Sequence, residues 1–198
     1  MPAFRLLSFL VLGFVLTSCE TTRLPHFPVK AGAEQLGNEN QLHFGVVEFD
    51  DDGNLHPNSR EKQLEPILAT LRERPTTLVV FVHGWMNDAS EDSGNMQQFR
   101  HALIENAEVA PPKLAGSQIV GVMLSWRGKS KLNQLLGYLT YPERYNTAAR
   151  ISKASDPAIV LDELIRAARN HGYNSRVTLV GHSMGGLILE GAYTTHLK

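Results

Sequence analysis

The sequence predicts an α/β fold built on a mostly parallel β-sheet. Runs of β-branched and aromatic residues, which are typical of strands buried on both faces, occur at 77–82 and 119–126. Segments with apolar residues at helical spacing separate these runs, and this alternation is typical of a parallel sheet with helices on its faces. The 198 residues, 42% hydrophobic and 20% charged, are enough for one domain with a hydrophobic core.

The first half of the chain is expected to begin with a strand at 42–49 (LHFGVVEF). The Asp-rich run 50–54 follows. A calcium loop is one interpretation of this run, but Gly53 stands at the wrong offset for an EF-hand, which favours a solvated turn. A helix is expected over 59–73, and Pro66 inside it would kink or restart the helix. After the strand at 77–82, Asn95 is expected to cap the next helix.

The second half is expected to contain a strand at 119–126 (IVGVMLSW), a long connection at 127–155, and a helix that Asp156 caps. The last strand is expected at 177–180, followed by a tight turn and a final helix. The connection is rich in leucine and tyrosine between 132 and 141. Two interpretations are open, a cap over an acyl pocket and a helix packed on the sheet, and the second is favoured.

The single cysteine, Cys19, is expected to carry a lipid. A positive start and an apolar segment too short to span a membrane precede it, as in a secretory signal, and 16–19 (LTSC) resembles a bacterial lipobox. The alternative is a plain secretory signal with an incidental cysteine. The predicted organisation is a signal peptide at 1–18, a tether at 19–41 and an α/β domain at 42–198. The protein would then be attached to a membrane of the bacterial envelope by its acylated Cys19.

The charge pattern argues against a nucleic-acid partner. The chain carries 19 basic and 20 acidic residues, for a net charge of −1, and no basic stripe.

The stretch 181–186 (GHSMGG) is the candidate catalytic motif. It follows a short apolar strand and precedes a helix-compatible run, which is the context that a serine nucleophile on a strained strand-to-helix turn requires. Ser183 is the candidate nucleophile, and Gly181 and Gly185 allow the turn. The backbone N–H of Met184 and that of Trp85 are the candidate oxyanion-hole donors, with Met86 as the less favoured alternative to Trp85.

These motifs resemble those of the α/β-hydrolase superfamily, specifically its lipase- and esterase-like members. The resemblance rests on His83-Gly84-Trp85, on GHSMGG and on 125–128 (SWRG), and it covers most of 42–198. It implies hydrolysis of small-molecule or lipid esters by a Ser-acid-His triad, with neither metal nor organic cofactor. It also implies that His83 braces the oxyanion loop and that Gly84 supports it.

The acid and histidine of the triad follow the serine in this superfamily. Glu190 and His196 are the only such residues after Ser183, and on a helix they would lie about 10 Å and about 20 Å from it along the axis. The chain is therefore expected to be the N-terminal portion of the fold, with the Ser183 strand at the sheet edge. The leading hypothesis is a serine ester hydrolase that is incomplete as given. The alternatives are a non-catalytic envelope lipoprotein that keeps the fold as a binding module and, more weakly, an acyltransferase.

Overall fold

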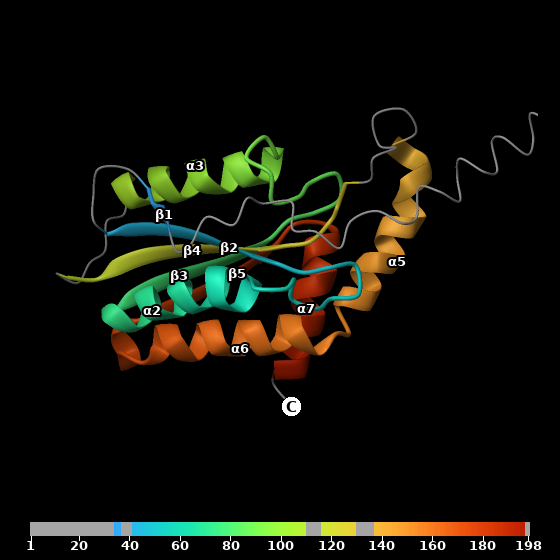
Figure 1. Cartoon of the computed structure of the whole chain (residues 1–198). Coiled ribbons are helices and arrows are strands. Elements are labelled where there is room, and N and C mark those ends of the chain that lie inside the picture. The colour runs from blue at the N-terminus through green and yellow to red at the C-terminus, as the bar shows by residue number, and fades with distance from the viewer. Residues whose placement is uncertain (1–33, 37–40, 110–115, 130–136, 197–198) are drawn as a thin grey trace, which may run out of the picture.

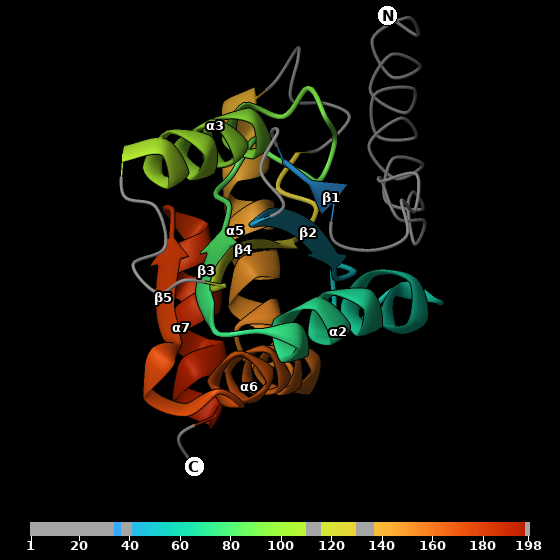
Figure 2. The ribbon, with the colours of Figure 1, turned by 90° about the vertical axis from the view of Figure 1, so that its left-hand side faces the viewer.

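The computed structural model describes residues 34–36, 41–109, 116–129 and 137–196. A five-stranded sheet in the order β1-β2-β4-β3-β5 forms the middle of three layers (Figures 1 and 2). Neighbouring strands from β2 to β5 run parallel, and β1 alone is antiparallel to its neighbour. The α/β class and the mostly parallel sheet predicted from the sequence are confirmed.

The strands lie within one or two residues of the predicted ranges. They are β2 (Leu42–Glu48), β3 (Thr76–Val82), β4 (Gln118–Ser125) and β5 (Arg176–Gly181). Every side chain of β4 is buried, which explains its continuous apolar sequence at the centre of the sheet. The predicted position of the strand before Ser183 is also confirmed, because β5 forms an edge of the described sheet.

The helices cover the two faces unequally. The helices are α2 (Glu65–Glu73), α3 (Gly94–Val109), α5 (Tyr141–Ile151), α6 (Ser155–Arg169) and α7 (Met184–His196), with short turns η2 (Arg60–Leu64), η3 (Gly137–Thr140) and η4 (Gly172–Asn174). Helix α3 packs on β2 and β4 over one face, and α6 and α7 pack on β3 and β5 over the other (Figure 2). Two hydrophobic clusters, one on each face, therefore stabilise the sheet.

The domain begins earlier than predicted. Strand β1 (Glu34–Gln35) pairs with β2, and the next residue, Leu36, is buried against the sheet, although the range 19–41 was expected to be a tether. Sequence periodicity misses a two-residue strand because it is too short to show an alternation. The expected signal peptide and Cys19 lie outside the described residues. No helix in the described part of the chain is long and apolar enough to cross a membrane.

Pro66 neither breaks nor restarts the helix. Leu64 and Glu65 have helical φ and ψ, so the π-helical turn η2 continues directly into α2, and Pro66 lies just after the change from π to α geometry. The Asp-rich run forms the expected turn, in which Gly53 has a φ of +84° and donates its N–H to the carbonyl of Asp50.

Two predicted helix caps are wrong. Helix α6 starts at Ser155, with Ala154 as its N-cap, and the carboxylate of Asp156 instead accepts the N–H of Leu55 at 2.9 Å. Asn95 lies inside the first turn of α3, and its N–H donates to Oδ1 of Asn87 at 2.9 Å. In both cases a residue from a distant or preceding loop competes for the polar group, which local sequence does not reveal.

The described part of the 127–155 connection lies at one end of the sheet, and residues 130–136, on which both interpretations partly rest, lie outside the described residues. The described part contains η3 and α5, and α5 lies beyond the carboxyl ends of the strands, where it packs against α7 (Figure 1). The favoured prediction of a helix packed on a sheet face is therefore wrong for the described residues. Ala148 and Ile151 bury one side of α5 in the core, whereas Tyr141 and Tyr145 on its other side are about half exposed.

Candidate active site

Ser183 occupies a sharp turn between β5 and α7. Its φ of +54° lies in the left-handed region, which residues with a side chain adopt only when the surrounding structure enforces it. The N–H of Gly185 donates to the carbonyl of His182 at 2.9 Å, and the N–H of Gly186 donates to the carbonyl of Ser183 at 2.8 Å. These bonds close the turn directly into the first residues of α7 and leave the Ser183 side chain exposed.

Gly181 and Gly185 are required because the backbone has no room for a Cβ at either position. A Cβ on Gly185 would stand 2.2 Å from the carbonyl oxygen of Val82, and one on Gly181 would stand 2.6 Å from Cα of Gly186. Gly186 differs, because a Cβ there would meet its nearest atom at 3.7 Å, an ordinary contact. The two glycines of the motif therefore allow β5, α7 and the end of β3 to approach closely.

The loop after β3, residues 83–86, lies directly against this turn. The N–H of His182 donates to the carbonyl of Val82 at 2.9 Å. A Cβ on Gly84 would stand 2.8 Å from Nδ1 of His182 and 3.1 Å from Cβ of Ser183. The tertiary fold thus brings together the two motifs that lie about a hundred residues apart in the sequence, and a side chain on Gly84 would separate them.

Two backbone N–H groups at this junction have no hydrogen-bond partner among the described residues. They belong to Trp85 and to Met184, the first residue of α7. The N–H of Met86, by contrast, donates to the carbonyl of Gly128 at 2.9 Å. Free N–H groups next to a serine can bind a developing oxyanion, and the geometry favours Trp85 over Met86 for this role.

His83 is fully buried and supports the loop from below. Its Nδ1 lies 3.0 Å from the carbonyl oxygen of Gly84, so Nδ1 carries the proton and Nε2 is an acceptor. Nε2 accepts the N–H of Trp126 at 3.2 Å and lies 2.9 Å from Oγ of Ser125. Burial lowers the pKa of His83 to about 4. The ring is therefore neutral at pH 7, and both of its nitrogens are engaged away from Ser183.

Sequence reasoning missed two asparagines that hold the loop. Nδ2 of Asn87 donates to the carbonyl of Trp85 at 2.9 Å. Oδ1 of Asn95 accepts the N–H of Gly84 at 3.3 Å and lies 3.2 Å from Nδ1 of His182. The only available signal was the position of both residues in the polar segment after the HGW motif, and it could not show where their side chains point.

The described residues bring no general base to Ser183. Its hydroxyl has no hydrogen-bond partner among them. Glu190 is exposed on α7, and His196 is the last residue of that helix. Asp88 is buried in the loop but pairs with Ser90 and, at 3.5 Å, with Lys129. Within the described ranges, no cluster of three or more His, Cys, Asp or Glu residues could hold a metal ion.

An aromatic surface adjoins the loop. The Trp85 ring packs edge-on against Tyr141, at 5.2 Å between centroids, and lies 6.2 Å from the ring of Tyr138. Tyr138 is 89% exposed, and the adjacent Leu139 is 73% exposed. Exposed apolar side chains therefore surround the Trp85 ring, which suits an apolar group on a bound molecule.

Residues 57–193 match the model of a protein family described as alpha/beta hydrolase of unknown function (DUF900). The match covers more than half of the chain and includes both the HGW loop and the GHSMGG turn. No curated protein and no solved structure gave a significant match.

Proposed function

The chain belongs to this family of α/β-hydrolases of unknown function, and on that premise we propose that it is a serine hydrolase of carboxylic esters with Ser183 as its nucleophile. The observation that carries the proposal is the strained φ of +54° at Ser183, whose turn packs directly against the loop of Gly84 and which is followed by the unpaired N–H of Met184. Strained backbone conformations cluster at functional sites.

The proposed reaction follows from this geometry. The hydroxyl oxygen of Ser183 attacks the ester carbonyl, and its proton passes to a base. The negative oxygen of the tetrahedral intermediate accepts hydrogen bonds from the N–H groups of Met184 and Trp85. The N-terminus of α7 adds its partial positive charge at the same point. Each such donor contributes about 2.7–4 kcal/mol to stabilisation of the transition state. Collapse of the intermediate expels the alcohol and leaves an acyl-enzyme, which water then hydrolyses.

Esters with a large apolar group are the substrate class that the surroundings favour, lipid esters among them. The Trp85 ring belongs to the same residue as the proposed oxyanion donor, so a carbonyl bound there lies close to the Trp85, Tyr138 and Tyr141 rings. Burial of an apolar chain against such rings stabilises binding by about 25 cal/mol per Å².

A second candidate function is a non-catalytic binding protein that keeps the hydrolase fold. It is favoured by one observation, the absence of a base hydrogen-bonded to Ser183 within the described residues. The two candidates differ in whether Ser183 is activated at all, so a direct measurement of its acylation separates them.

The test is acylation by p-nitrophenyl butyrate in a concentrated imidazole buffer, with the imidazole supplying the base that the described residues do not present. Peptide mapping by mass spectrometry should find the butyryl group on Ser183 and none on that peptide in Ser183→Ala. Ser155 is an internal control, because it is also exposed at the start of a helix but lies in no strained turn. Equal acylation of Ser155 and Ser183 would contradict the proposal, and no acylation of Ser183 would favour the binding protein.

A further inference from the structure

We propose that Asn95 is a positioning residue that couples the nucleophile turn to the oxyanion loop; this inference rests on the proposed role of Ser183. One atom makes the coupling. Oδ1 of Asn95 accepts the N–H of Gly84 in the loop at 3.3 Å and lies 3.2 Å from Nδ1 of His182, the residue before Ser183. A carboxamide oxygen has two lone pairs, so it accepts from both groups at once.

The Asn95 side chain is itself held in place. Its backbone N–H donates to Oδ1 of Asn87 at 2.9 Å, and its Nδ2 lies 3.4 Å from Oε1 of Gln98. Asn95 also sits in the first turn of α3, a helix anchored by Met96 and Phe99 in the hydrophobic core. The carboxamide is therefore held by α3 while it contacts both the loop and the turn.

Asn95 helps to fix the direction in which the backbone N–H of Trp85 points. The peptide plane between Gly84 and Trp85 is rigid, and in a trans peptide its C=O and N–H point in opposite directions. The carbonyl of this plane accepts from Nδ1 of His83 at 3.0 Å. On either side, Asn95 holds the N–H of Gly84 and Asn87 holds the carbonyl of Trp85. Without the Asn95 acceptor, the N–H of Gly84 loses its hydrogen bond, and the peptide plane that carries the Trp85 N–H can rotate more freely.

Oδ1 of Asn95 also fixes the position of the Trp85 N–H relative to the Met184 N–H. Met184 follows His182 by two residues, so a bond to His182 places the turn, and with it the Met184 N–H. Catalysis needs both N–H groups within about 2.7–3.1 Å of one oxyanion, a tolerance that independent movement of loop and turn would exceed. Asn95 thus positions the two N–H groups for the transition state and does not itself contact the substrate.

The contact also dictates a tautomer. Because Oδ1 is an acceptor only, the neutral His182 ring carries its proton on Nδ1 when it faces Asn95. This gives a spectroscopic signature of the coupling that does not depend on any activity.

The experiment compares Asn95→Leu, which keeps the branched shape but removes the acceptor, with Asn95→Asp, which keeps an acceptor oxygen. Asn106→Leu is the matched control, because Asn106 is an exposed asparagine of the same helix whose Nδ2 donates to the carbonyl of Ala102, at 2.7 Å, within that helix. The full chain is used throughout. The readouts are the rate and half-saturation concentration of Ser183 acylation by p-nitrophenyl butyrate in imidazole, and the His182 tautomer and Gly84 amide exchange by NMR.

Asn95→Leu should slow acylation about tenfold at saturation with little change in half-saturation, the loss expected of one hydrogen bond. It should also shift the His182 tautomer and expose the Gly84 amide to exchange. Asn95→Asp should recover most of each effect, and Asn106→Leu should show none. An unchanged tautomer and an unchanged Gly84 exchange in Asn95→Leu would overturn the coupling. If no variant is acylated, the proposed function fails, and the NMR readouts still decide whether Asn95 joins turn and loop.

Discussion

At the scale of single residues, the site depends on close backbone approach more than on side-chain chemistry. The oxygen of Val82 would lie 2.2 Å from a Cβ on Gly185, although Gly186, the next residue, has ordinary space. Both glycines belong to α7, so helix propensity acts equally on them. Alanine substitutions at Gly185 and Gly186 therefore share the effect of helix propensity and differ only in the steric clash.

We expect Gly185→Ala and Gly186→Ala to change stability in opposite directions. The clash at position 185 should lower the free energy of unfolding by about 3 kcal/mol, at the upper end for overpacking. Alanine at position 186 should raise it by about 0.5–1 kcal/mol, because alanine loses less backbone entropy in a helix. Urea denaturation followed by circular dichroism measures both. Equal destabilisation by the two substitutions would show that the turn is not as tight as described.

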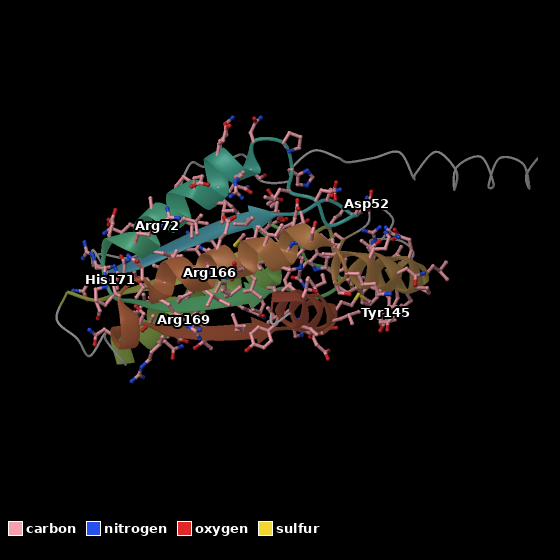
Figure 3. The ribbon with its side chains drawn as sticks, turned by 90° about the horizontal axis from the view of Figure 1, so that it is seen from below. Asp52, Arg72, Tyr145, Arg166, Arg169 and His171 are labelled. Carbon is pink, nitrogen blue, oxygen red and sulfur yellow. The ribbon has the colours of Figure 1, made fainter. Side chains whose placement is uncertain are left out.

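At the scale of elements, buried charge fixes α5 at the carboxyl ends of the strands. Arg144 of α5 is 1% exposed and binds both carboxylate oxygens of Asp51, each at 3.2 Å. It also donates to the carbonyl of Arg127 at 2.8 Å. Burial by itself raises the pKa of Asp51, but the hydrogen bonds from Arg127 and Arg144 outweigh it and hold that pKa below its ordinary value. Figure 3 shows Asp52 and Tyr145 at this same end of the molecule.

Arg144→Met should lower the free energy of unfolding by roughly 2 kcal/mol, because it removes the hydrogen bonds of a buried guanidinium to Asp51 and to the carbonyl of Arg127. The control is Arg166→Met. Arg166 pairs with Asp162 at 2.7 Å on the exposed surface of α6, where ion pairs contribute little (Figure 3). Urea midpoints should therefore fall for Arg144→Met and stay near the wild-type value for Arg166→Met. Similar midpoints for the two variants would mean that the cluster does not hold α5.

At the scale of the whole molecule, β5 is the exposed edge of the described sheet. Its Val177 and Leu179 pack on the core, but Val180 on the opposite face is 41% exposed. On that face of the sheet, helix α3 packs on β2 and β4. An apolar, uncovered edge strand can pair with another strand, so this region is where the molecule is expected to associate.

Val180→Lys should reduce concentration-dependent self-association, because a charged side chain on an edge strand opposes pairing. Ile159→Lys is the matched control, since Ile159 is similarly exposed, at 48%, but lies on α6 rather than on a strand. Sedimentation velocity over a range of concentrations measures the effect. Association that both substitutions reduce equally would indicate general hydrophobic contact instead of edge pairing.

The sequence by itself determined the class of fold and the position of the turn. Buried strands are read directly from continuous apolar runs, as in β4, because burial on both faces leaves no polar position. The need for glycine at positions 181 and 185 could also be predicted from the sequence, since a strained turn accepts few other residues. Strand β1 was not predicted, because two residues are too short to show an alternation. The caps of α3 and α6 were wrong because residues outside the local segment compete for the polar groups. The placement of α5 depends on its packing against α7, which the local sequence does not reveal.

Only the tertiary structure decided which hydrogen-bonding groups near Ser183 are paired and which are free. It showed that the Met86 N–H is taken by Gly128, that the Trp85 N–H is free, and that Asn95 faces Gly84 and His182 instead of capping its helix. A sequence shows which hydrogen-bond donors and acceptors a segment contains, and the patterns of helix caps and turns pair them with residues nearby in the chain. Their actual partners depend on which segments folding brings within about 3 Å of one another, and that is a property of the packed molecule.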